Sequence, residues 1–239
     1  MPTTRKYTFD IDTKRYLNRV NTYRQLNGLP NIAIADAVDI DNFVIGLKDL
    51  GLWVDSYIWL LMSQYNVAAG TSLVGLNVNT PTGTLVNSPT WSTSGVVFLN
   101  SSAQRIDIPV TFSFGDTYTL FASAKLTNIA ATNLTVLSFG NNRGGLIGVS
   151  SNGSTLLRNN QWAVDTSSVF GALNGDYRMS SATRLPTIGS FHISGTTYSG
   201  PFNGNIHIAF MLKRSITASA QSSLHNLYKN TVGKNLGLP

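Results

Sequence analysis

The chain has 239 residues, enough to bury a large core in one big β domain with an extra segment or in two modest domains. It contains no cysteine and no glutamate, which excludes disulfide scaffolds, thiolate metal sites, cysteine nucleophiles and every mechanism that needs a glutamate. Charged residues are only 12% of the chain, and the net charge is +6. Because the basic residues beyond position 65 are scattered, with Lys213 and Arg214 the single adjacent pair, no nucleic-acid partner is expected.

A first helix is predicted over residues 13–27. Its apolar residues recur every three or four positions, as on the buried face of a helix: Tyr16, Leu17, Val20, Tyr23 and Leu26. Asp12 or Thr13 can cap its start, and Asn27 with Gly28 can end it. The other face is basic and is most simply a solvated surface, although a basic helix can also lie on an acidic partner: Lys14, Arg15, Arg19 and Arg24.

A second helix is predicted over residues 33–50, with acids near its start and Gly51 placed to end it. Its apolar stripe comprises Ile34, Ala37, Phe43, Val44, Leu47 and Leu50. Residues 52–61 carry Trp53 and Trp59 and are interpreted as the hinge that packs this helical arm on a sheet.

The longest apolar run, residues 57–62, fits a buried strand or short helix and is far too short to cross a membrane. No apolar signal core follows the N-terminus, so secretion by the general route is not expected.

From residue 71 onward the apolar pattern alternates, which indicates strands that are separated by Gly, Asn, Ser and Pro clusters. Six strands are predicted: residues 96–99, 105–108, 118–121, 135–139, 146–149 and 205–210. Their regular spacing is typical of a β-sandwich, and Asn152-Gly153 predicts a hairpin turn. A last helix is predicted over residues 218–230, capped by Thr217 or Ser219 and ended by Gly233.

No catalytic or metal site emerges from the residue pattern. His192 and His207 each lie between apolar neighbours in a predicted strand, so alternation directs their imidazoles to the opposite, solvent-facing side. The sequence has no G-x-S-x-G nucleophile elbow, and the four acids of the β region lie apart: Asp107, Asp116, Asp165 and Asp176. The expectation is a protein without catalytic activity, cofactor or metal.

Exposed aromatic residues are the remaining lead to a binding site. Trp162 and Tyr177 lie in polar, loop-like surroundings, and a flat ring beside amide or guanidinium groups is a common way to stack on sugars. The nearby turn residues Asn141, Asn142 and Arg143 complete the candidate carbohydrate site. The alternative interpretation is that these rings close the rim of the sandwich.

Four stretches resemble the laminin-G-like, concanavalin A-like jelly rolls: residues 83–91, 95–98, 118–122 and 198–206. The order of these pieces and the terminal helix match that family. Residues 41–53, placed just before such a domain, resemble an arrangement found in tailed-bacteriophage virion proteins. Jelly-roll members that hydrolyse glucans use a Glu-x-Asp-x-Glu strand, which this chain lacks, and the acids of the calcium-dependent members find no match here.

The resemblance implies a mainly β protein, an antiparallel concanavalin A-like jelly-roll sandwich (residues 66–239) with an N-terminal helical arm (residues 1–65) and a C-terminal helix. It implies a virion component, either a capsid decoration or cement protein or a compact fibre part, assembled in the host cytoplasm. Its partners would be other virion proteins and copies of itself, with no membrane insertion. The alternative is a tail-fibre adhesin that recognises a host-surface polysaccharide.

A two-helix arm of this size cannot bury enough apolar surface alone, so its stripe must pack on the sandwich or on another chain. The residues expected to anchor it are Tyr16, Leu17, Val20, Tyr23, Phe43, Val44, Leu47 and Trp53. If they dock on a neighbouring subunit, deleting residues 1–30 is expected to abolish incorporation and to leave a folded sandwich.

Overall fold

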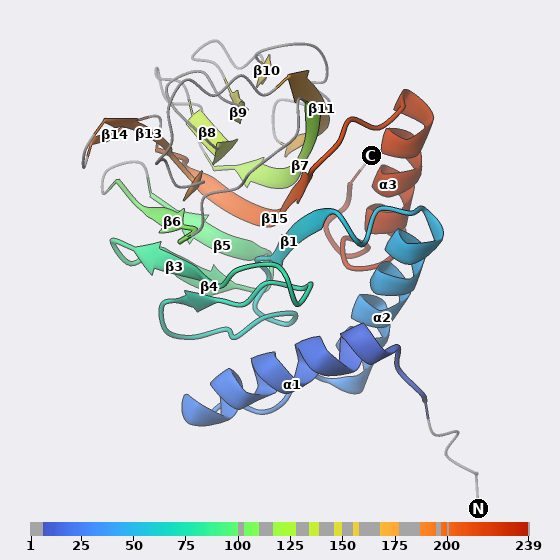
Figure 1. Cartoon of the computed structure of the whole chain (residues 1–239). Helices are drawn as coiled ribbons and strands as arrows, with labels where there is room; N and C mark the ends of the chain where they lie inside the picture. Colours follow the sequence, from blue (N-terminus) through green and yellow to red (C-terminus); the bar gives the residue numbers. More distant parts are fainter. Residues whose placement is uncertain are drawn as a thin grey trace, which may run out of the picture.

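The structure is a computed structural model that describes residues 7–99, 103–109, 117–127, 134–138, 146–149, 155–157, 168–176, 187–194, 197–199 and 201–238. In this part of the chain the fold is mainly β, with antiparallel sheets and three helices (Figure 1). The helices are α1 (Ile11–Leu26), α2 (Ile34–Asp49) and α3 (Ala218–Asn230).

All strand pairs in the described residues are antiparallel, and they form two sheets and a separate hairpin. The first sheet has the order β11 (Ser168–Asp176), β7 (Thr117–Leu126), β15 (Gly204–Leu212), β5 (Gly95–Phe98) and β4 (Thr90–Ser92), and β1 (Ser56–Leu60) also pairs with β15. The second sheet has the order β10 (Thr155–Leu157), β9 (Leu146–Val149), β8 (Leu134–Ser138), β12 (Thr187–Ile188), β6 (Arg105–Asp107), β3 (Gly83–Val86) and β2 (Ser72–Leu73). The hairpin joins β13 (Phe191–Ser194) and β14 (Thr197–Ser199).

Apolar clusters cover both faces of the first sheet. Successive side chains of a strand point to opposite faces, so one strand contributes to both clusters. On β15, Ile208, Phe210 and Leu212 pack in an apolar cluster shared with the three helices. Ala209 and Met211 face the other way and pack in a second cluster, which includes side chains of both sheets. The helices, the first sheet and the second sheet therefore form three successive layers.

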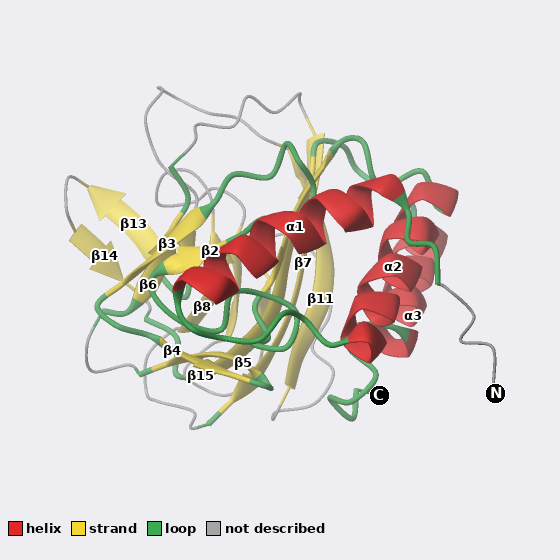
Figure 2. Cartoon of the chain, turned by 90° about the horizontal axis from the view of Figure 1, so that it is seen from below, coloured by secondary structure: helices red, strands yellow, loops and turns green. Residues whose placement is uncertain are grey.

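The three helices enclose the first cluster from the outside of the first sheet. Helices α2 and α3 lie side by side, while α1 crosses below them (Figures 1 and 2). The rings of Phe43 on α2 and Tyr228 on α3 lie 6.3 Å apart, and Phe121 of β7 lies 5.7 Å from Tyr228. Tyr16 and Val20 of α1 are fully buried in the same cluster. None of the helices among the described residues combines the length and apolarity that crossing a bilayer requires.

Helix α1 is fixed to the body of the protein by two arginines that the sequence analysis interpreted as part of a solvated face. That interpretation is wrong for Arg24, which is 9% exposed, and for Arg19, which is half-buried. Burial lowers the pKa of both guanidinium groups. Both donate to backbone carbonyls: Arg24 to those of Pro30, Ser63 and Asn66, and Arg19 to those of Gly75 and Leu76.

The predicted helices and strands are present, with small shifts at their ends. Helix α1 starts earlier than predicted, because Asp10 rather than Asp12 or Thr13 is its N-cap and accepts a hydrogen bond from the Asp12 amide. Thr217 caps α3 as expected. Each of the six predicted strands overlaps an observed one. The Asn152-Gly153 turn lies outside the described residues, although β9 and β10 on either side of it do pair.

The predicted boundary at residue 65 does not separate two cores. Strand β1 precedes this boundary, yet it pairs with β15 over five residues, so the segment interpreted as a hinge is part of the first sheet. Of the two packing partners that the sequence left open for the arm stripe, the chain's own sheet is the one observed. Deleting residues 1–30 would remove Tyr16 and Val20 from this core, so we expect the sandwich that remains to be destabilised rather than intact.

The orientation expected for His207 is wrong. This residue is 2% exposed, because β15 is a central strand that is covered on both faces. A β-bulge between Ile206 and Ile208 also interrupts the alternation on which the expectation rested. The side chain of His192 lies outside the described part of the structure.

Candidate functional site

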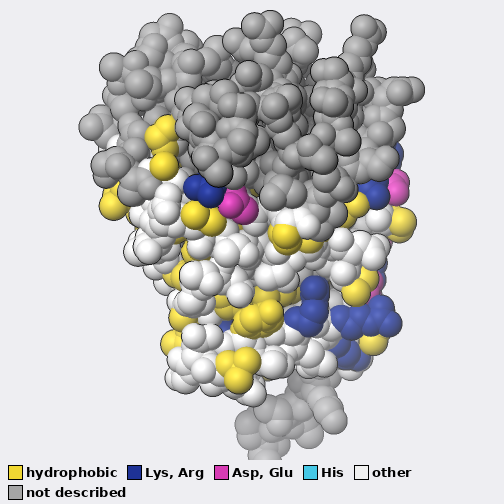
Figure 3. Space-filling model, turned by 60° about the vertical axis from the view of Figure 1, so that its left-hand side comes forward, with side chains coloured by type: hydrophobic (Ala, Val, Ile, Leu, Met, Phe, Trp, Pro, Cys, Tyr) yellow, Lys and Arg dark blue, Asp and Glu magenta, His cyan; other side chains and the backbone are white. Residues whose placement is uncertain are grey.

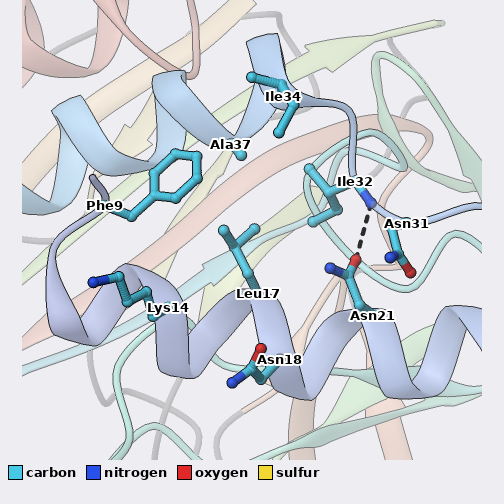
Figure 4. A pocket seen from close by; sticks show the side chains of 9 residues that line it. All are labelled: Phe9, Lys14, Leu17, Asn18, Asn21, Asn31, Ile32, Ile34 and Ala37. Atoms are coloured by element: carbon cyan, nitrogen blue, oxygen red, sulfur yellow. Dashed lines mark hydrogen bonds between the residues drawn. The ribbon is translucent and has the colours of Figure 1, made fainter. Parts of the chain in front are cut away.

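A groove of about 420 Å³ lies between α1, the loop that follows it and the start of α2 (Figure 4). Its floor is apolar: Phe9, Leu17, Ile32 and Ala37 point toward one another. Ile34, which the sequence placed on the buried stripe of α2, is 68% exposed at the edge of this floor.

The rim of the groove is polar. Lys14, Asn18 and Asn21 follow one another along α1 at intervals of one turn, and Asn31 faces them from the interhelix loop. The Asn21 side-chain oxygen accepts a hydrogen bond of 2.9 Å from the Ile32 amide, which fixes the loop on the helix. The nine lining residues include one ammonium group and no carboxylate, so the lining is positively charged.

Two rim groups are free to contact a ligand. Lys14 and Asn18 are exposed, and among the described residues neither side chain has a hydrogen-bond or ion-pair partner. The neighbouring cations are already paired: Arg15 lies 3.2 Å from Asp12, and Lys48 contacts both Asp10 and Asp12. The hydrogen bond from Lys48 lowers the pKa of Asp10, which keeps this carboxylate ionised. Lys14 is therefore the cation that the helix pair offers to a partner.

Sequence reasoning grouped Lys14 with the basic face of α1 and gave no role to Asn18, Asn21 or Asn31. A signal was present, because residues 14, 18 and 21 have the spacing of one helical face. Which residues would stand opposite that face could be known only from the packing of the interhelix loop.

Most residues predicted to anchor the arm are buried within the chain itself. Six of the eight are at most 8% exposed: Tyr16, Val20, Phe43, Val44, Leu47 and Trp53. Leu17 is half-buried on the groove floor, and Tyr23 is 37% exposed. Tyr23 and Leu26, which is 80% exposed, lie on the final turn of α1, where the chain leaves the core. Surface-exposed anchors must therefore be sought among other side chains.

Among the residues whose burial the structure describes, most of the exposed large apolar side chains lie in the helical part. Of the nine large hydrophobic residues that are exposed in the described structure, six belong to residues 7–45: Tyr7, Ile11, Tyr23, Leu26, Ile34 and Ile45. The space-filling view shows Lys and Arg side chains gathered low on one face beside hydrophobic ones (Figure 3). A surface that exposes apolar and cationic groups together can bind a partner that supplies apolar and acidic ones.

The five residues of the predicted carbohydrate site lie outside the described residues: Asn141, Asn142, Arg143, Trp162 and Tyr177. Of the candidate acids, Asp116 and Asp165 lie there too, and nothing is described of the Asp176 side chain. Asp107 forms an ion pair of 2.9 Å with Arg105 on the same strand. Within the described ranges, no three His, Cys, Asp or Glu side chains group as a metal site requires.

Among the described residues, the buried pair Ser123 and His207 comes closest to a catalytic arrangement. Ser123 Oγ lies 3.0 Å from His207 Nδ1, and both residues are at most 2% exposed. Burial, with a smaller contribution from Lys125, lowers the pKa of His207 to about 4. A nucleophile must reach its substrate, and both residues are buried on inner strands of the first sheet, so we interpret the pair as structural.

Comparisons with known proteins find no matching family model and no matching curated protein. Solved structures of Trypanosoma rangeli sialidase are similar in fold. A mutant displaying trans-sialidase activity has a TM-score of 0.51 and 12% identity, and the match covers 83% of this chain and 40% of that one. The complex with sialic acid has the same TM-score and identity over 93% of this chain and 39% of that one. This chain therefore spans about 40% of the length of these sialidases, and the likeness shows the fold alone.

Proposed function

We propose that the chain is a non-catalytic structural protein of a tailed-bacteriophage virion, a capsid decoration or cement protein or a compact fibre component. In this proposal the two sheets are a concanavalin A-like jelly roll displayed outward, and the helical part contacts the neighbouring virion protein. The observation that carries it is that six of the nine large hydrophobic residues exposed in the described part of the chain lie in residues 7–45. The resemblance of residues 41–53 to virion proteins supports the same assignment.

The structure changes how the helices would serve as an anchor. The expected stripe packs on the chain's own sheet, so attachment would use the outer side of the helices. Each large apolar side chain buried at such an interface contributes about 1.5–3 kcal/mol. Four or five of them contribute about 6–15 kcal/mol, which is comparable to the entropy cost of association of about 4–15 kcal/mol, so rim hydrogen bonds or ion pairs would have to add to a stable contact.

Immunogold labelling of intact particles from the source lysate tests the location. Gold over the head supports a decoration protein, gold confined to the tail supports a fibre component, and unlabelled particles refute a virion role. The surface is tested with Leu26→Ser/Ile34→Ser, since Leu26 and Ile34 are 80% and 68% exposed. We expect at least a tenfold loss of incorporation. Val78→Ser is the matched control, because Val78 is 61% exposed outside the helices.

The second candidate is a carbohydrate-binding tail-fibre adhesin that recognises a host-surface polysaccharide. Two observations favour it: the fold likeness to a sialidase in complex with sialic acid, and the excess of basic over acidic residues after position 65. An acidic sugar would suit this charge. A glycan array with Trp162→Ala as control separates the candidates, since binding that depends on Trp162 supports the adhesin and the absence of any binding refutes it.

A further inference from the structure

The groove between α1 and α2 has a shape that suits an extended chain. Lys14 and Asn18 are four residues apart on the helix, a separation of about 6 Å along its axis. Two residues of an extended peptide span about 6.6 Å, so residues i and i+2 of a peptide parallel to α1 can meet Lys14 and Asn18. From Lys14 to Asn21 the rim measures about 10 Å, the length of three extended residues.

The chemistry of the groove matches the same ligand. Amide side chains both donate and accept hydrogen bonds, which is what the backbone N-H and C=O groups of an unpaired strand require. Asn18 supplies an exposed amide without a partner in the described structure, and Asn31 stands on the opposite rim. The apolar floor formed by Leu17 and Ile32 accepts the alternate side chains of such a peptide. A sugar would be expected to need a flat, exposed aromatic ring, whereas Phe9, the one aromatic lining residue, is part of the core packing.

Charge selects the partner. The lining carries the Lys14 ammonium and no carboxylate, and the whole chain has a net charge of +6, so a second copy of this chain is electrostatically disfavoured. We infer that the groove binds an extended peptide segment of a neighbouring protein, with apolar residues on the floor and a carboxylate at Lys14. This inference rests on the proposed function in one respect, that the neighbour is a virion protein.

The test uses the ¹⁵N-labelled full chain and two synthetic probes, acetyl-Leu-Ser-Ile-Asp-amide and acetyl-Leu-Ser-Ile-Asn-amide, which differ in one carboxylate. We expect both probes to shift the amide signals of residues 14–21 and 31–37, and the acidic probe to bind roughly two- to fivefold more tightly. Lys14→Gln should make the two probes equal. Arg15→Gln, which also removes one positive charge from α1 but lies outside the groove lining, should keep the difference.

Asn18→Trp fills the groove from an exposed helix position and should abolish binding of both probes. The inference is overturned if neither probe shifts the groove signals, or if Lys14→Gln and Arg15→Gln respond alike. It is also overturned if the groove signals shift with protein concentration alone, which would make a second copy the occupant, or if they respond to oligosaccharides and not to peptides. The peptide-binding test needs no virion, so a negative result would refute the groove inference without bearing on the immunogold test of the proposed function.

Discussion

Acidification should destabilise this protein through His207, well before its carboxylates titrate. The imidazole belongs to β15, a central strand of the first sheet, and the residue is 2% exposed. Nδ1 shares a hydrogen bond with Ser123, and Nε2 has no hydrogen-bond partner within the described structure. A charged imidazole there would be poorly solvated and would be repelled by Lys125, so burial lowers the pKa of His207 to about 4.

The size and sign of this loss of stability follow from the difference between the pKa of His207 in the folded and in the unfolded state. In the unfolded chain the pKa is 6.5, so between pH 6.5 and about 4 the unfolded state binds the proton more readily than the folded one. The stabilisation by neutral His207 is therefore complete above pH 6.5 and is lost as the pH falls to about 4. At about 1.4 kcal/mol per pH unit, the loss from this group is on the order of 3 kcal/mol.

Urea unfolding at half-unit steps from pH 7.5 to 4 measures this loss. The variant His207→Asn keeps a side chain that can bond to Ser123 but does not titrate, so its free energy of unfolding should fall much less over the same range. His225→Gln is the control, since His225 is half-exposed on α3 and should keep most of the wild-type slope. Equal slopes in the wild type and in His207→Asn would refute the assignment of the buried imidazole.

Three further perturbations test the packing. Deleting residues 1–30 removes the buried Tyr16 and should lower the free energy of unfolding by several kcal/mol, seen as a lower urea midpoint; an unchanged midpoint would show that α1 is dispensable. Asn66→Ala removes a buried amide that makes four hydrogen bonds and should cost about 3 kcal/mol in the same assay, against less than 1 for an exposed site. The melting temperature of Gly95→Ala should lie well below that of Gly28→Ala: both glycines have positive φ, but a Cβ at Gly95 would collide with the backbone carbonyl oxygen of Ile206, whereas no atom is near a Cβ at Gly28.

The helices and strands could be predicted because their signals are local. Alternation identified residues 205–210 as a strand, and the observed β15 contains all of them. What alternation could not give is the number of covered faces. A strand with apolar residues on one side resembles an edge or half-buried strand, but β15 has neighbours on both edges and layers on both faces. The burial of His207 follows from this position in the sheet.

The burial of Arg19 and Arg24 on α1 is a second feature that could not be predicted from the sequence. Arg24 is buried without a carboxylate partner in the described structure, and it donates instead to carbonyls from residues 30, 63 and 66. These acceptors come from loops, and no sequence periodicity encodes the path of a loop. The sequence therefore predicts a solvated basic face on α1, although part of that face is buried. The hydrogen bonds to residues 63 and 66 fix α1 on the loop that follows β1, because a guanidinium with three carbonyl acceptors has little rotational freedom.

That rigidity bears on the groove. The rim residues Lys14, Asn18 and Asn21 stand on a helix held at Arg19 and Arg24, and the opposite wall is held by the bond from the Ile32 amide to Asn21. A ligand would therefore meet walls that are already in place and would pay little of the ordering cost that weakens binding to flexible loops. Replacing Asn21 with Ala should loosen the far wall and weaken both peptide probes equally, while the preference for the acidic probe, which depends on Lys14, should remain. A loss of that preference in Asn21→Ala would mean that the carboxylate of the acidic probe is not recognised by Lys14 alone.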